Sequence, residues 1–157
     1  MAGQLSDITI KPIGIVRSKV KQKPKPEYNW QELVSEIVID GSLNEALDGL
    51  EGYSHIIVIY WLHQAVAPGR MAIKVHPRGE TELPLVGIFA SRSPHRPNPL
   101  GQKVVRLLGR KANVLRVKGL DAIDKTPVID IKPYIPGYDS VAEATVPQWT
   151  ENKQASA

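Results

Sequence analysis

The chain has 157 residues, a length typical of one domain with its own hydrophobic core. It contains no cysteine, which excludes disulfides, thiolate nucleophiles and cysteine-ligated zinc. No apolar stretch reaches the roughly 18 residues that a membrane-spanning helix needs, and the N-terminus has no signal-peptide pattern. We therefore expect a single-domain cytoplasmic protein over residues 1–157, with no membrane partner.

The net charge of +4 is unevenly distributed along the chain. Residues 26–56 carry seven acidic residues and no Lys or Arg, whereas residues 57–118 carry eleven Lys or Arg against two acids. A basic segment of this kind predicts an anionic partner such as phosphate or nucleic acid. A solvated basic face is the alternative, because it would have the same composition.

Apolar runs bounded by Gly, Pro and polar residues predict seven or eight short strands. The run at 55–62 is apolar almost throughout, which predicts a strand buried on both faces. One helix is expected at 42–50, where Ser42 and Glu45 form a capping-box pattern. The strands are expected at 8–20, 33–39, 55–62, 71–75, 85–90, 114–117 and 127–131, and residues 101–108 suit either a strand or a helical turn.

Strands do not alternate with helices, so a doubly wound parallel sheet is not expected. Many short strands with Gly/Pro turns predict a mostly β fold, either a barrel or a sandwich, with mainly antiparallel strands. Segment 19–28 is a basic loop interrupted by prolines, and it is either an arm over a ligand or a plain surface loop. The tail at 148–157 is expected to be flexible or to lie on a neighbour.

The stretch VGIFASRSPHRPNPLG at 86–101 is the strongest candidate for a functional site. Its three prolines exclude a helix or a central strand and make the loop stiff. A rigid loop that displays polar side chains suits the binding of a carboxylate or a phosphate. The displayed groups belong to Arg92, His95, Arg96 and Asn98.

A second polar cluster follows at 121–134. Asp121 and Asp124 bracket a turn, where aspartate is common for purely local hydrogen bonds. Asp130 alternates with isoleucines in a strand, and is expected to line a polar pocket or to pair with an arginine. Ion pairs of Asp121 or Asp130 with the arginines of the proline-rich loop would hold that loop in place without any ligand.

Other kinds of site have little support. The four histidines do not pair at metal-ligand spacing, so no metal is expected. The glycine-rich fingerprints GxGxxG and GxxxxGK[ST] are missing, which excludes the usual nucleotide-binding folds. The aromatic content of 6% gives little support to an RNA-recognition sheet built on stacking aromatics.

Three motifs resemble the TsaA-like (YaeB/TrmO-like) family of S-adenosylmethionine-dependent tRNA methyltransferases, which have a β-barrel and not a Rossmann fold. They are GIFASRSPHRPNP at 87–99, GLD at 119–121 with TPV at 126–128, and DIKPY at 130–134. The segments PIGIV at 12–16 and LEGYSHI at 50–56 are also similar, so the resemblance covers about residues 8–140.

This resemblance implies a closed antiparallel β-barrel of about seven or eight strands with one short helix. It also implies a homodimer with S-adenosylmethionine bound near the subunit interface. The implied reaction is methyl transfer to the N6 amine of threonylcarbamoyl-adenosine, the modified base beside the anticodon of certain tRNAs.

The resemblance also implies roles for individual residues. Because the accepting nitrogen is a weak nucleophile, a base or hydrogen-bond acceptor would help, and Asp121 and Asp130 are the candidates. Substrate contacts are implied for Arg96, His95, Asn98, Lys132 and Tyr134. Cofactor contacts are implied for His63, Gln64, Arg92, Gln102, Ala122, Ile123, Asp124 and Lys125.

Two segments depart from the family pattern. Pro26-Glu27-Tyr28 stands where the family often has Pro-Arg-Gln, and Asp124-Lys125-Thr126-Pro127 where it often has Asp-Gly-Thr-Pro. Both lie near expected cofactor contacts. Two other functions therefore stay open: a methyltransferase for a small molecule, and a non-catalytic barrel that binds S-adenosylmethionine or RNA.

Overall fold

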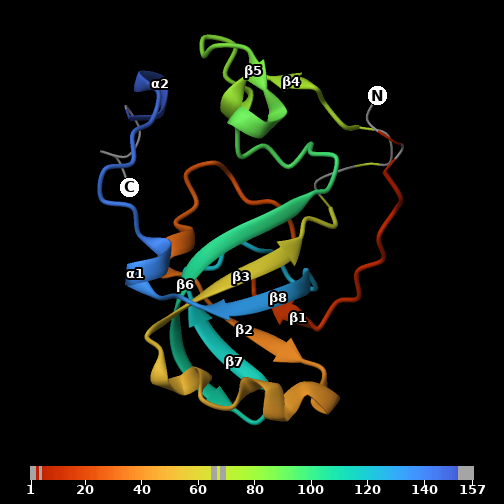
Figure 1. Cartoon of the computed structure of the whole chain (residues 1–157), viewed down its shortest axis with the longest axis vertical. Coiled ribbons are helices and arrows are strands. Elements are labelled where there is room, and N and C mark those ends of the chain that lie inside the picture. Colours follow the sequence, from red (N-terminus) through yellow and green to blue (C-terminus); the bar gives the residue numbers. More distant parts are fainter. Residues whose placement is uncertain (1–2, 4, 65–66, 68–69, 152–157) are drawn as a thin grey trace.

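Six antiparallel strands close into a barrel in the order β1-β2-β7-β6-β3-β8 in the computed structural model, which describes residues 3, 5–64, 67 and 70–151 (Figure 1). A separate two-stranded sheet stands beyond one end of the barrel. The barrel strands are β1 (Gly14–Arg17), β2 (Val34–Ile39), β3 (His55–Trp61), β6 (Leu100–Lys111), β7 (Val114–Lys118) and β8 (Pro127–Pro133), and the small sheet pairs β4 (Lys74–Val75) with β5 (Val86–Gly87).

The prediction of a mostly β, closed antiparallel barrel is confirmed, but the barrel has six strands and not seven or eight. The difference lies in the predicted strands at 71–75 and 85–90, which pair only over two residues each and outside the barrel. Ile73 is 70% exposed and Leu85 is 55% exposed, and the one buried apolar side chain of these two segments, Ile88, lies outside the core cluster of the barrel. After Gly87 the chain turns at once into a 3₁₀ helix, Ile88–Ala90.

The helix predicted at 42–50 is instead two 3₁₀ helices, Gly41–Leu47 and Leu50–Gly52. Gly49 lies between them with a φ of 87°, a left-handed conformation that ends the first helix. The predicted capping box is wrong, because Asp40 is the N-cap residue. Its carboxylate accepts hydrogen bonds from the backbone N–H of Ser42 (2.9 Å) and from the Ser42 hydroxyl (2.6 Å).

The two α-helices of the described residues follow the barrel: α1 (Pro136–Asp139) and α2 (Gln148–Glu151). The predicted flexible tail therefore begins with an ordered turn, and residues 152–157 lie outside the described residues. The first strand is shorter than the predicted 8–20, because pairing starts at Gly14. Within the described residues, no helix is long and apolar enough to cross a bilayer.

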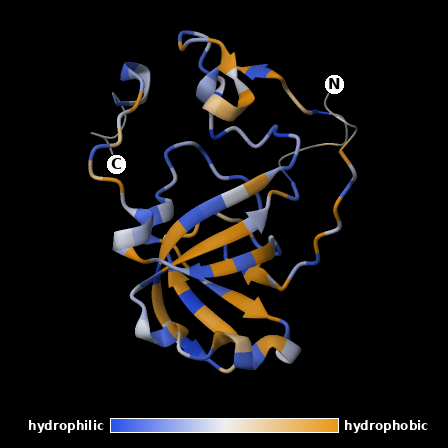
Figure 2. Cartoon of the chain, in the orientation of Figure 1, coloured by the Kyte–Doolittle hydropathy of each residue, from blue (hydrophilic) through white to orange (hydrophobic). Residues whose placement is uncertain are grey.

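The core fills the barrel with branched apolar side chains. Ile37, Ile56, Val58, Leu115 and Val117 are each fully buried, and each contributes roughly 1.5–3 kcal/mol of burial free energy. Figure 2 shows the hydrophobic positions recurring along the barrel strands. In β3 three consecutive residues, 56–58, are buried, as predicted for a strand covered on both faces.

The antiparallel order determines where a site can form. Strands β1, β7 and β3 run toward one end of the barrel, and β2, β6 and β8 start there. Three connections therefore meet at this end, which we call the loop end: residues 18–33, the described part of 62–99 (62–64, 67 and 70–99), and 119–126. The small β4–β5 sheet belongs to the second of these connections (Figure 1).

Arg110 lies at the opposite end of the barrel, and its side chain is only 12% exposed. Its guanidinium pairs with Asp48 (2.9 Å) and donates to the carbonyl oxygens of Ala112 (2.8 Å) and Asn44 (2.9 Å). The side chain thus ties the 3₁₀ segment to the β6–β7 turn.

We predict that Arg110→Ala lowers the free energy of unfolding by about 1.5–3 kcal/mol, because several charge-assisted hydrogen bonds are lost. Urea denaturation measures this change. Arg106→Ala, on the exposed face of the same strand, is the control and should change stability by no more than about 0.5 kcal/mol. Equal effects of the two variants would contradict the proposal that Arg110 stabilises the fold by joining the 3₁₀ segment to the β6–β7 turn.

Lys125 adopts a φ of 63°, the left-handed region where a side chain is unfavourable. It stands where the resembled family often has glycine. We predict that Lys125→Gly raises the free energy of unfolding by about 0.5–1 kcal/mol, since relief of strain outweighs the added chain entropy of glycine. Gly119→Ala, at a φ of 96° in the same loop, should act in the opposite direction, and thermal unfolding of both variants checks this.

Candidate active site

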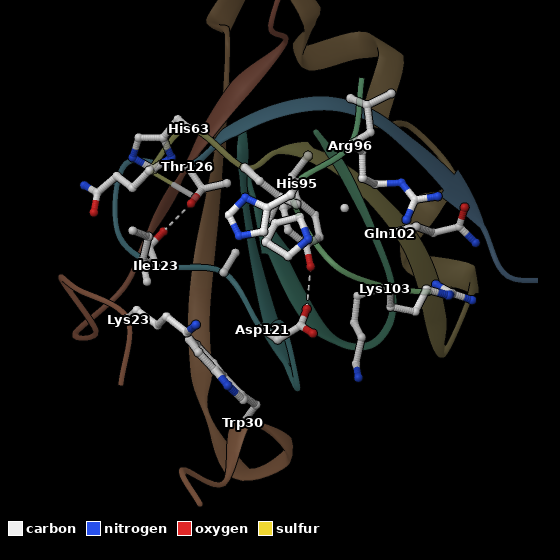
Figure 3. Close-up of a pocket in the computed structure, with 18 of the residues that line it drawn as sticks. Lys23, Trp30, His63, His95, Arg96, Gln102, Lys103, Asp121, Ile123 and Thr126 are labelled. Carbon is white, nitrogen blue, oxygen red and sulfur yellow. Dashed lines mark hydrogen bonds between the residues drawn. The ribbon is translucent and has the colours of Figure 1, made fainter. Parts of the chain in front are cut away.

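A pocket with a volume of about 1060 Å³ lies at the loop end. All three connections of that end contribute to it, together with the ends of β3 and β6. Figure 3 shows Lys23 and Trp30 on one side, Gln102 and Lys103 on the other, and Asp121 between them. A second hollow of about 580 Å³ is lined by residues of the opposite end, among them Leu43, Leu47 and Asp130.

A part-buried hydrogen bond lies in the pocket wall. Tyr60 is 3% exposed, and its hydroxyl donates to Oδ1 of Asp121 over 2.5 Å (Figure 3). Burial raises the pKa of Tyr60, and the negative charge of Asp121 raises it further, while the positive charge of Arg92 acts in the opposite direction. Tyr60 is therefore a neutral hydrogen-bond donor at ordinary pH, and Asp121 is its acceptor.

Glycine at position 101 makes room for the Tyr60 ring. Gly101 lies directly opposite Tyr60 in the β3–β6 ladder, and a Cβ at that position would overlap the ring. Because residue 101 has no side chain, the Tyr60 ring can lie across β6 at this position and reach Asp121.

The turn after Asp121 forms a second wall of the pocket. Ala122 and Thr126 are buried, and the Thr126 hydroxyl donates to the Ile123 carbonyl oxygen over 2.7 Å (Figure 3). Ala122 and Ile123, for which the family resemblance implies cofactor contacts, line the pocket. Asp124 and Lys125, also predicted as cofactor contacts, do not line it.

Asp124 instead holds the first connection against the third. Its carboxylate accepts from the backbone N–H of Ser18 (2.9 Å) and pairs with Lys21 (2.8 Å), while its own N–H donates to the Val20 carbonyl oxygen (2.7 Å). The bond to Lys21, and then that to Ser18, lowers the pKa of Asp124. Segment 19–28 is therefore fastened beside the pocket, and its residues Lys23 to Pro26 line it.

Arg96 stabilises the proline-rich loop internally. Its Nη1 donates to the carbonyl oxygens of Ser91 (2.7 Å), Ile88 (3.2 Å) and Ser93 (3.4 Å). The same guanidinium lies 5.8 Å from the centre of the Phe89 ring. The loop is thus held by carbonyl groups of its own backbone.

The alternative of ion pairs between the loop arginines and Asp121 or Asp130 is wrong for the described residues. Asp121 accepts from Tyr60, and Asp130 pairs with Lys132 over 2.7 Å. Arg92 remains exposed at the pocket, and its charge reaches Tyr60. His95 also lines the pocket, with a buried Nδ1 that has no hydrogen-bond partner among the described residues.

Most of the predicted site residues meet in the pocket, but six lie outside it. Because β8 runs away from the loop end, Asp130 and the residues after it are carried toward the opposite end. Asp130 lines the second hollow, and the Tyr134 ring packs edge-on against His55 with 6.4 Å between the ring centres. The residues inside are His63, Gln64, Arg92, His95, Arg96, Gln102, Asp121, Ala122 and Ile123, and those outside are Asn98, Asp124, Lys125, Asp130, Lys132 and Tyr134.

Several residues that line the pocket were not predicted from the sequence. Tyr60 does carry a signal, because its hydroxyl lies within an apolar strand, shortly before the polar pair His63-Gln64. Trp30 and Lys103 offer no such signal, since only the fold brings them to the loop end. The other missed residues with polar or aromatic side chains are Lys23, Lys25, Phe89, Ser91 and Thr126.

The pocket combines groups of different chemistry. Arg92 and the nearby lysines suit a carboxylate or phosphate, the Asp121 carboxylate suits a cation or an N–H donor, and Ala122 with Ile123 offers an apolar surface. No group of three or more potential metal ligands occurs within residues 3, 5–64, 67 and 70–151.

Comparisons with known proteins agree with this arrangement. The family model of the "tRNA-methyltransferase O N-terminal domain" matches residues 15–140. A probable S-adenosyl-L-methionine-binding protein of Methanothermobacter thermautotrophicus is 44% identical over 137 residues, which cover 86% of this chain and 96% of that protein. The tRNA (adenine(37)-N6)-methyltransferase of Escherichia coli is 32% identical over 152 residues, covering 90% of this chain and 63% of that one.

Solved structures agree as well. A crystal structure titled as TrmO superimposes with a TM-score of 0.72 at 35% identity, and the match covers 90% of this chain and 64% of the other. Some relatives are longer, and the chain covers only 37% of a probable S-adenosyl-L-methionine-binding protein of Archaeoglobus fulgidus that is 40% identical. With a family model that matches residues 15–140 and a relative matched over nearly its whole length, the chain belongs to the tRNA-methyltransferase O family.

Proposed function

We propose that this chain is an S-adenosylmethionine-dependent methyltransferase that acts on tRNA. The observation that carries the proposal is the Tyr60–Asp121 pair, an oriented carboxylate in a cationic pocket. Membership of the tRNA-methyltransferase O family supports it, as do relatives whose names state S-adenosyl-L-methionine binding.

The pocket residues fit the chemical groups of this cofactor. Arg92 is suited to its carboxylate, and the Asp121 carboxylate to the positive charge near the reacting centre. His63, Gln64 and Gln102 provide further polar contacts, and the Ala122–Ile123 turn provides an apolar wall. When bound, S-adenosylmethionine supplies an electrophilic methyl group.

Asp121 is the proposed proton acceptor. Tyr60 occupies Oδ1 of Asp121 and so fixes the orientation of the carboxylate, which leaves Oδ2 for an N–H of the substrate. Asp121 would accept a hydrogen bond from the attacking nitrogen and take its proton as the new bond forms. Asp130 is not kept in this role, since it lies in the other hollow and pairs with Lys132.

The proposed acceptor is the N6 amine of threonylcarbamoyl-adenosine beside the anticodon. The name of the Escherichia coli relative supports adenine N6 as the methylated position. Cationic groups at the pocket, among them Arg92 and Lys103, suit the phosphates of tRNA and the threonyl carboxylate. We also infer, from the family resemblance alone, that the chain forms a homodimer and works in the cytoplasm.

The direct test is methylation of tRNA from cells that lack this modification. The expected result is transfer of labelled methyl from S-adenosylmethionine to a single adenosine beside the anticodon. Transfer to a component of a small-molecule extract, with tRNA unmodified, would replace the proposed substrate. Cofactor binding without transfer to either would support a non-catalytic barrel.

We predict that Asp121→Asn lowers kcat by about 10²–10⁴-fold, because an amide cannot take the proton. The KM for tRNA should change little, since the substitution keeps the shape of the side chain. Asp130→Asn is the matched control and should leave kcat unchanged. A loss of activity in the Asp130 variant with normal activity in the Asp121 variant would reverse the assignment.

A further inference from the structure

Phe89, the one phenylalanine of the chain, lines the pocket with 78% of its surface exposed. An exposed aromatic ring contributes nothing to the core, and burying it against a ligand would be favourable. By contrast, Tyr60 and Ala122 of the same pocket are each only 3% exposed. Phe89 therefore belongs to the mouth of the pocket and not to its interior.

The Phe89 ring is held in place before any ligand arrives. It sits in the 3₁₀ turn Ile88–Ala90, which is closed by the Ser91 N–H and the Ser91 hydroxyl, both donating to the Ile88 carbonyl oxygen (3.2 and 2.9 Å). The Arg96 guanidinium lies 5.8 Å from the ring centre and is itself fixed by three backbone carbonyls. A ring supported in this way is a preorganised stacking surface.

Unpaired positive charges share the pocket with Phe89. Lys23, Lys25 and Lys103, which we call the rim cations, form no ion pair with any described residue. Trp30 lies near Lys23 on the side away from Lys103 (Figure 3). Aromatic rings combined with free cations are the groups that bind single-stranded nucleic acid, in which bases stack on rings and phosphates contact cations.

We propose that Phe89 stacks on an unpaired nucleobase of the RNA that enters the pocket, next to the base that is methylated, while the rim cations contact the neighbouring phosphates. The base must be unpaired and unstacked, because a base within a duplex has no free face. The identity of the RNA as tRNA rests on the proposed function, but stacking on single-stranded RNA does not depend on methyl transfer.

Charge favours RNA over a second copy of the chain as the occupant of this mouth. A two-fold interface centred on Phe89 would bring the rim cations of both copies together, and such like charges repel. An RNA strand supplies the opposite charge. Methyl transfer is proposed to take place beside Tyr60 and Asp121, so the exposed Phe89 is left for a base next to the methylated one.

The test measures the affinity of the full chain for a fluorescent RNA stem-loop with an unpaired seven-base loop, and for a duplex RNA of equal length. Phe89→Leu is expected to weaken stem-loop binding about tenfold, within the range for loss of one base–aromatic stack, and to leave duplex binding unchanged. Phe89→Tyr should restore the affinity. Leu85→Ala, an exposed apolar residue outside the pocket, is the control and should bind as the wild type does.

Salt dependence separates stacking from charge. Lys23→Ala and Lys25→Ala should reduce the slope of log affinity against log salt concentration, whereas Phe89→Leu should lower affinity at every salt concentration without changing the slope. Unchanged stem-loop binding by the folded Phe89→Leu variant would overturn the proposal.

Two further readouts exclude other roles for the ring. Calorimetry with S-adenosylmethionine should give the same affinity for wild type and Phe89→Leu, and a loss confined to cofactor binding would assign the ring to the cofactor. Sedimentation should give the same oligomeric state, and dissociation of the variant would assign the ring to a subunit contact. If the wild type binds the stem-loop through Phe89 but methylates no tRNA, the proposed function fails and the stacking proposal stands.

Discussion

The buried hydroxyl of Tyr60 needs a hydrogen-bond acceptor, and the arrangement of the candidate site follows from how that need is met. An unpaired hydroxyl in this position would be unfavourable by about 1–3 kcal/mol. Asp121 meets it from the β7–β8 connection, and Gly101 on β6 leaves the space that the ring requires. One hydrogen bond thus joins β3 to the third connection and orients a carboxylate toward the pocket.

Strand direction supplies the other parts of the site. The antiparallel order brings three long connections to one end, and Asp124 ties the first of them to the third. Arg96 holds the proline-rich loop with backbone carbonyls, which frees Arg92 and His95 for a ligand. The same geometry accounts for the residues that lie elsewhere, because each residue further along β8 is more distant from the loop end.

Local patterns in the sequence predicted the parts of the fold that depend on local physics. The strands β3 and β7 were predicted because the apolar runs that form them, and the turn residues that bound them, are neighbours in the sequence. The prediction of a strand over 85–90 was wrong, since pairing ends at Gly87 and two of its apolar residues, Leu85 and Phe89, face solvent. Asp130 and Tyr60 show the limit for the site: a residue's place at one end of a barrel depends on strand order, which no short segment encodes.

The central claim is that Tyr60 and Asp121 act as one unit, and a double-mutant cycle on kcat tests it most directly. Tyr60→Phe removes the hydroxyl and keeps the buried ring, and Asp121→Asn removes the proton acceptor. If the tyrosine acts through the aspartate, Tyr60→Phe slows methyl transfer in the wild-type background and adds little to the Asp121→Asn variant. Full multiplication of the two effects would contradict the account, because it would mean that the two residues act independently.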